Sequence, residues 1–289
     1  MDNKRGVILL TVLWTVALLT TLAMAASLTF RGFAAIMVVD RDRGKADALL
    51  TAGLEVASGF ASTAGERPLL DVESTVTLSS GNVAWRLDDE GGRIDIGKAP
   101  PEVLASLLRA VGAPEADALA RAIVVWRKPE GQTPGPQAQA PVPAGNPAAA
   151  KPAAPDSIIT DVSDLAQVPG MRPQWIAAIT PLVTVFGNET VNPRTAPAEV
   201  LAVLPGIEPA RLAAFLDLRR TVTDPKQLTA GLGAAQNFLA VKPPQAVRVH
   251  LAAVLADGYA ADAQAVIVCL PKDRQPYRVL FWTPLARPL

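Results

Sequence analysis

Residues that could carry acid–base, nucleophilic or metal chemistry are scarce in this sequence. The chain of 289 residues contains one histidine, His250, and one cysteine, Cys269. A metal site built on histidine and cysteine needs several such ligands, and a Ser-His-Asp site would have to use His250 itself. A single cysteine also excludes an intrachain disulfide. Because no nucleophile–base pair is visible, the sequence indicates that the protein is not an enzyme.

The candidate ligands that do occur together are acidic. Asp88, Asp89, Glu90 and Asp95 form a carboxylate cluster, but their spacing matches no EF-hand loop. A charged loop is the ordinary interpretation of such a cluster. The whole chain is balanced, with 27 Lys and Arg against 27 Asp and Glu. Zero net charge gives no general electrostatic reason to expect a nucleic acid as partner.

Short alternating segments at two places in the chain predict the elements that hold these residues. Residues 74–78 and 83–87 flank a turn cluster and predict a hairpin, and residues 93–96 are a further candidate strand. Three more strands are predicted in an antiparallel meander near the C-terminus, at 247–256, 263–270 and 277–283. His250 and Cys269 fall inside these strands, so a structural histidine and a buried cysteine are expected.

The N-terminus carries the strongest pattern. Residues 7–30 contain no charged side chain, and as a helix they would extend ~36 Å, enough to cross a bilayer core of roughly 30 Å. Lys4 and Arg5 precede this stretch, so the positive-inside rule leaves the N-terminus in the cytoplasm. A secretory signal cleaved near Ala25 or Ala26 and a plain single-pass anchor are the alternatives.

A helical pattern continues beyond the uncharged stretch. Apolar residues recur at three- and four-residue spacing up to Phe60, with charged residues between them. The pattern predicts one helix over residues 7–60, about 80 Å long. Gly32, Gly44 and Gly53 are candidate bends in it.

Between the two sets of strands lies a helical, proline-punctuated region. The order of elements predicts an α+β fold: a sheet built from 61–96 and 243–289, with an all-α domain inserted at 97–242. Within the insertion, residues 129–157 are rich in Pro and Ala and poor in large apolar side chains. Such a segment cannot offset its ordering entropy, and a flexible loop is expected there.

The inserted region contains an internal repeat. Ala-Pro-x-Glu-Val-Leu-Ala-x-Leu occurs at residues 99–107 and again at 196–204. In both copies Pro precedes a predicted helix, and Glu102 or Glu199 falls in its first turn, where the helix dipole favours a carboxylate. Apolar–Gly–apolar turns at Gly112, Gly170 and Gly206 resemble those of helix-hairpin-helix units.

Proteins with such hairpins often bind the DNA backbone, so a membrane-anchored DNA-binding or DNA-uptake protein is the second hypothesis for function. Glu208 stands in the third hairpin where phosphate-binding versions usually carry a second glycine, and a carboxylate there repels phosphate. Glu115 and Asp117 follow the first turn. Packing or protein contacts are therefore the favoured role of the hairpins, and a periplasmic enzyme is the third hypothesis.

Taken together, these segments resemble the minor pseudopilin K family of the type II secretion system, also called general secretion pathway protein K. The resemblance rests on the following stretches: Arg5-Gly6 before the apolar helix, residues 89–95 running into 99–104, residues 164–165 with 168–171, residues 181–186, and residues 191–193 with 196–201. It covers most of the chain apart from 129–157. It implies a pilin helix on an antiparallel sheet with a large inserted α domain.

The resemblance also implies a role and partners. The family role is that of a subunit at the tip of a periplasmic pseudopilus, in the inner membrane of a Gram-negative bacterium, with the bulk of the chain in the periplasm. Expected partners are the minor pseudopilins I, J and H, the inner-membrane assembly platform, prepilin peptidase, and the secretin or the exported proteins. Nucleic acid is not an expected partner.

Three residues near the N-terminus acquire roles through the same resemblance. A prepilin leader, residues 1–6, would be removed between Gly6 and Val7. Most pilins carry Glu at position five of the mature helix, where it neutralises the terminal amine of the preceding subunit. Here that position is Thr11, which suits a subunit with no predecessor.

Some pseudopilins bind calcium, so the resemblance also raises a calcium site. Asp88, Asp89, Glu90 and Asp95 would supply the oxygen ligands that this ion prefers. No cofactor is otherwise required.

Overall fold

The computed structural model describes residues 3–65, 67–70, 72–127, 159–219, 221–222, 224–270 and 273–285. At residues 3–11, 26, 28–36 and 226 it describes the backbone alone. The predicted flexible loop at 129–157 lies outside the described residues.

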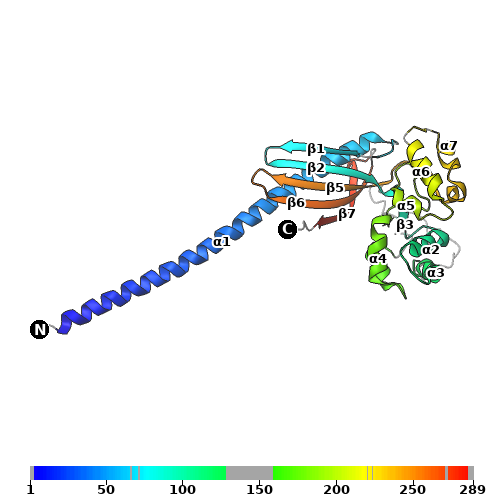
Figure 1. Cartoon of the computed structure of the whole chain (residues 1–289). Helices are drawn as coiled ribbons and strands as arrows, with labels where there is room; N and C mark the ends of the chain where they lie inside the picture. Colours follow the sequence, from blue (N-terminus) through cyan, green and yellow to red (C-terminus); the bar gives the residue numbers. More distant parts are fainter. Residues whose placement is uncertain are drawn as a thin grey trace, which may run out of the picture.

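The chain begins with one unbroken helix, α1 (Asn3–Ala64). Figure 1 shows its first half projecting away from the rest of the molecule, while its second half lies along the sheet. The expected long helix is confirmed, and it extends four residues beyond the predicted end at 60. The predicted bends at Gly32, Gly44 and Gly53 do not interrupt it.

Gly53 has a packing role instead. A β-carbon at this position would lie 2.5 Å from Cγ2 of Val83 on the sheet, so only glycine allows the helix to approach this closely. By contrast, a β-carbon at Gly44 would meet nothing within 4 Å.

The sheet has five antiparallel strands in the order β1-β2-β5-β6-β7. The strands are β1 (Val72–Leu78), β2 (Gly81–Asp89), β5 (Ala246–Leu255), β6 (Ala260–Cys269) and β7 (Tyr277–Leu285). All five agree with predicted segments to within a few residues. The chain leaves the sheet after β2 and returns as its neighbour β5, so strands far apart in sequence are paired at the centre of the sheet.

One face of the sheet packs on α1. Alternate residues of β2 and β5 point to the helix, among them Val83, Leu87 and Leu251. They meet the apolar stripe of α1 that includes Leu50 and Leu54. We call this apolar layer the sheet core. Regular alternation in the strands and three- to four-residue spacing in the helix build it.

The described residues between 90 and 245, which connect β2 to β5, form a separate block with its own apolar core. Its helices are α2 (Pro101–Ala110), α3 (Ala116–Trp126), α4 (Pro173–Ile179), α5 (Ala198–Ala202), α6 (Pro209–Leu218) and α7 (Pro225–Ala230). In the described part of the block, four short 3-10 helices accompany them: η1 (Glu90–Gly92), η2 (Val162–Gln167), η3 (Thr180–Leu182) and η4 (Gly233–Phe238). Figure 1 shows the block at the end of the sheet that is far from the N-terminus of α1.

The block is not all-α, which corrects one prediction. Strands β3 (Ile94–Asp95) and β4 (Val183–Thr184) form a two-stranded parallel sheet within it. Residues 93–96 were expected to extend the main sheet, but the turn of η1 directs the chain away from β2 before β3 begins. Pairing with β4 then satisfies the backbone groups of this buried segment.

Candidate functional site

The polar residues that the sequence singled out gather where the sheet meets the block. We call this region the polar junction. It is built by the end of β2, by η1, β3, β4 and β5, and by a loop of the block. Its members are Asp88, Asp89, Glu90, Arg93, Asp95, Thr184, Asn192, Thr195, Arg248 and His250.

Glu90 forms the central contact of the junction. Its side chain is completely buried, and it pairs with Arg248 of β5. The guanidinium makes two bonds to the carboxylate, from Nε to Oε1 and from Nη2 to Oε2 at 3.1 Å. The hydroxyl of Thr184 on β4 donates to the same carboxylate. A bidentate pair of this kind ties the block to the centre of the sheet.

Asp89 organises the backbone of the loops around it. It is the N-cap of η1 and accepts from the amide of Gly91 at 2.9 Å. It also accepts from Nδ2 of Asn192 at 3.0 Å and from the hydroxyl of Thr195 at 2.7 Å. Burial raises the pKa of Asp89, although these three bonds act in the opposite direction.

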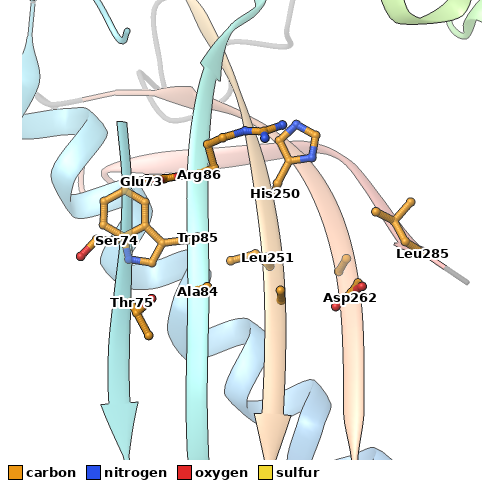
Figure 2. Close-up of a pocket in the computed structure, with 12 residues that line it drawn as sticks. Glu73, Ser74, Thr75, Ala84, Trp85, Arg86, His250, Leu251, Asp262 and Leu285 are labelled. Atoms are coloured by element: carbon orange, nitrogen blue, oxygen red, sulfur yellow. The ribbon is translucent and has the colours of Figure 1, made fainter. Parts of the chain in front are cut away.

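Asp88 faces the side of the sheet opposite α1. His250 Nε2 lies 3.0 Å from its carboxylate, and Arg86 Nε and Arg93 Nη2 lie at 3.4 Å and 3.7 Å. Burial by itself would raise the pKa of Asp88. The hydrogen bond with His250 and the nearby arginine charges outweigh burial and hold this pKa below its ordinary value. Figure 2 shows Arg86 extending toward the ring of His250, its cross-strand partner.

Asp95 lies deeper, in β3. It accepts from the amide of Gly97 at 2.8 Å, and Lys98 Nζ is 3.5 Å from its other oxygen. Burial raises the pKa of Asp95, and the charge of Lys98 offsets part of this effect.

The junction does not have the geometry that the calcium prediction requires. Asp88, Asp89, Glu90 and Asp95 point to different protein donors, and within the described ranges no group of three or more His, Cys, Asp or Glu could hold a metal ion. Asp88, Asp89 and Glu90 bond to donors of the chain, whereas Asp95 accepts from Gly97 and its Oδ2 is buried with no hydrogen-bond partner among the described residues. Calcium binding by this protein therefore stays a prediction without a site in the described part of the chain.

Sequence reasoning missed the partners of these carboxylates. Arg248 is the charged member of an otherwise mostly apolar strand, and that pattern could have indicated a buried ion pair. Thr184, Asn192 and Thr195 lie about a hundred residues away from their partners, and no local pattern connects them.

The side of the sheet that does not contact α1 is hollowed in two places. A shallow cavity of about 560 Å³ crosses the open face, with Glu73, Arg86, His250 and Leu285 among its lining residues (Figure 2). A second cavity of about 310 Å³ lies between β6 and β7 of the sheet and the block. Its walls include Val266, Phe281, Ile176 and Phe186.

The three predicted turns are present, each with its glycine in the left-handed region. The φ angles are 76° at Gly112, 85° at Gly170 and 78° at Gly206. Turn amides are used internally: Ala113 N donates to Leu108 O at 3.0 Å, and Met171 N donates to Val168 O at 3.1 Å. These two amides therefore already donate hydrogen bonds within the chain and are not available to a phosphate group. The interpretation of the block as helix-hairpin-helix repeats stays a prediction.

The predicted processing and assembly residues lie in the first part of α1. Gly6, Val7 and Thr11 are helical, and their side chains lie outside the described residues. Further along, Leu13, Trp14, Leu18, Leu22 and Met24 are exposed. For the side chains that are described, no helix has a stretch both long and apolar enough to span a membrane.

Comparison with known proteins gives one family and one fold. Residues 83–188 match the family described as type II secretion system protein K. No curated protein matches the chain. A solved structure with a similar fold is the GspK-GspI-GspJ complex of the enterotoxigenic Escherichia coli type 2 secretion system. The TM-score is 0.55 at 14% identity, covering 86% of this chain and 100% of that one.

The family match includes most of β2, the Asp88–Asp95 part of the polar junction and the turns at Gly112 and Gly170. Of the stretches that carried the resemblance in sequence, it includes residues 89–95, 99–104, 164–171 and 181–186 but not Arg5-Gly6 or residues 191–201. The fold likeness covers a larger share of the chain, 86% of it. The family match over residues 83–188 and the fold likeness together support the assignment of this chain as a type II secretion system protein K.

Proposed function

We propose that this protein is the tip subunit of the periplasmic pseudopilus, where it initiates or caps assembly with the minor pseudopilins I, J and H during protein export across the outer membrane. The observation that carries the proposal is the position of the block. It sits at the end of the sheet remote from the free part of α1 (Figure 1). In a filament whose shaft is made of α1 helices, such a block occupies the distal end.

The polar junction supports this role mechanically. The buried pair of Glu90 with Arg248 joins the block to the middle of the sheet rather than to an edge. A block held in this way transmits force to the sheet and to α1 as one body. That property suits a subunit that leads a growing filament.

Thr11 supports the same position in the filament. An unpaired N-terminal amine is costly in an apolar filament core, and Glu at position five normally neutralises the amine of the preceding subunit. With Thr at this position the chain has no group to pair with a predecessor. A leading subunit requires none.

The proposal includes processing and location. Prepilin peptidase cleaves between Gly6 and Val7, residues 7–30 anchor the mature chain in the inner membrane as a single pass, and the sheet and block lie in the periplasm. The assembly platform is a further partner, and the block meets the secretin or the exported proteins.

N-terminal sequencing of the protein purified from membranes tests the processing step. We expect a mature chain that starts at Val7. A start near residue 26 or 27 would indicate an ordinary signal peptide, and an intact leader would indicate a plain anchor. Either result contradicts the proposed role of α1.

The tip position is tested by Thr11→Glu, with Thr11→Val as the matched uncharged control. The glutamate gives the chain a partner for a predecessor's amine, so we expect less capping and reduced secretion, whereas Thr11→Val keeps both. The readouts are co-purification with the minor pseudopilins and export of a substrate protein. Unchanged secretion by Thr11→Glu, with no sister subunits bound, would remove the tip assignment.

The DNA-binding alternative has its own test. Retention of the full chain on immobilised duplex DNA that weakens with rising salt would favour it. The engaged turn amides lead us to expect no retention even at low salt.

A further inference from the structure

The two edges of the main sheet differ sharply in chemistry. Strand β1 exposes mainly polar side chains, including Glu73, Ser74, Thr75 and Thr77. Strand β7 exposes large apolar ones: Val279 44%, Leu280 47%, Phe281 37%, Trp282 38% and Leu285 41%. Edge strands usually protect themselves with charged side chains, and β7 has only Arg278, which pairs with Asp273 at 3.2 Å.

Strand β7 also has the backbone geometry of an unpaired edge. It pairs with β6 on one side and is last in the order β1-β2-β5-β6-β7. No other described element forms a ladder with it. The backbone donors and acceptors on its outer side form a row that an extended segment of another chain can complete.

A cavity adjoins this edge, and alternate side chains of β7 line it. Phe281 and Thr283 of β7 line the 310 Å³ cavity together with Val266 of β6 and with Val185 and Phe186 of the block. Its charged wall residues are engaged: Arg248 is paired with Glu90, and Asp161 accepts from the amide of Ser163 at 2.7 Å. An uncharged, apolar side chain therefore fits it better than a charged one.

Two features of β7 limit which strands can pair with its outer edge. The ladder with β6 is irregular at Val266 and Ile267, which leaves Leu280 without an opposite residue. Pro284 has no amide hydrogen to donate. Both restrict the register in which a further strand can pair.

We propose that β7 is the docking strand for a neighbouring minor pseudopilin, which adds an extended, uncharged segment to this edge and inserts apolar side chains into the adjoining cavity. The occupant follows from the chemistry: the backbone row calls for a strand, and the exposed apolar residues and the charge-paired cavity call for apolar partners. This inference rests on the proposed function, since it names the surface through which the partners bind.

Hydrogen exchange of backbone amides tests the proposal directly. The probes are the minor pseudopilins I, J and H, co-expressed with the full chain and purified in detergent. In the complex we expect amides of residues 277–285 to exchange at least about tenfold more slowly than in the chain alone, with no change at 72–78. A complex that forms without slowing exchange in β7 overturns the inference while leaving the proposed function intact.

Substitutions at the two edges provide a matched comparison. Leu280→Lys and Trp282→Lys place charges on β7, and Thr75→Lys and Thr77→Lys place them on β1. We expect at least about tenfold weaker partner binding from the β7 pair and less than about twofold from the β1 pair. Unchanged exchange in β6 of each variant shows that the fold is kept. Equal effects at both edges contradict the inference.

The remaining outcome is measured on the chain without its partners. If exchange in β7 slows as protein concentration rises, with a dimer mass in solution, the occupant is a second copy and the inference is overturned. If no complex with any minor pseudopilin forms, the proposed function fails and this inference fails with it.

Discussion

The sheet core and the polar junction solve the same problem, burial of the backbone, in different ways. In the sheet core, α1 and the strands satisfy their own backbone groups, so the interface is filled mainly by apolar side chains. At the junction the backbone is irregular, and the chain buries Asp89, Glu90, Asp95, Thr184 and Asn192 there. The backbone of a helix or sheet needs no hydrogen bonds from side chains, whereas buried irregular segments need side-chain acceptors for their amides.

This difference affects how each region tolerates change. The sheet core depends on shape, as the close approach of Gly53 to Val83 shows. The junction depends on matched charge, as the enclosed pair of Glu90 and Arg248 shows. Substitutions that alter volume should therefore harm the first region, and substitutions that remove one charge should harm the second.

The largest expected effect comes from Glu90→Ala. Removing the carboxylate leaves Arg248 buried without its partner, which should lower the free energy of unfolding by about 3–5 kcal/mol. Urea denaturation of the full chain in detergent measures it, with the exposed Glu73→Ala as control. The double variant Glu90→Leu, Arg248→Met should recover most of the loss, because no unpaired charge remains. A loss below about 1 kcal/mol for Glu90→Ala would show that the junction does not depend on this pair.

Next in size is Gly53→Ala. Alanine favours a helix by about 1 kcal/mol, but the added methyl group would overlap Val83, and overpacking costs about 1–3 kcal/mol. We expect a net loss of about 1 kcal/mol in the free energy of unfolding. Gly44→Ala is the matched control: it meets nothing within 4 Å and should gain up to about 1 kcal/mol. Equal effects of the two changes would show that Gly53 has no packing role.

Acid should weaken the junction through Asp88. Its pKa in the folded protein lies below the ordinary 3.8, so the stabilisation is present above pH 3.8 and is lost as pH falls through the folded pKa. Asp88→Asn should therefore make the free energy of unfolding less dependent on pH below about 4. Asp95, whose pKa is raised by burial, has the opposite sign and loses its contribution as pH rises through its folded pKa. An unaltered acid profile for Asp88→Asn would contradict the ion-pair description.

The smallest expected effect lies at the start of β7, where it meets α1. The Tyr277 hydroxyl donates to Glu55 Oε1 at 2.8 Å, and burial together with this carboxylate raises the pKa of Tyr277 to about 12. Glu55→Gln should move that pKa toward 10 without reaching it, because burial remains. Spectrophotometric titration of the chain's two tyrosines, Tyr259 and Tyr277, measures the shift. A pKa that stays near 12 would show that Glu55 has no part in it.

Local patterns predicted the regular elements well. The three- to four-residue spacing before Phe60 predicted α1, and alternation predicted the five strands of the main sheet. The repeat placed Glu102 and Glu199 in the first turns of α2 and α5, as observed. Patterns of this kind succeed because the side-chain period of an element follows from its backbone geometry.

The site was less predictable from the sequence, for one reason. Asp88, Asp89, Glu90 and Asp95 were grouped by closeness in sequence, but strand alternation and the η1 turn send them in different directions. Residues 93–96 were assigned to the main sheet for the same reason, whereas β3 pairs with β4 about ninety residues later. The separation of two residues in the sequence does not indicate which donor will bond to a buried carboxylate.

By itself, the sequence determined the long helix, the strands, the interruption of the sheet and the family resemblance, because each depends on short-range periodicity or a contiguous motif. Only the tertiary structure decided that Glu90 pairs with Arg248, that Gly53 is a packing contact, and that β7 is an apolar edge. These features join residues distant in the chain, and their free energies exist only when folding removes water from between them.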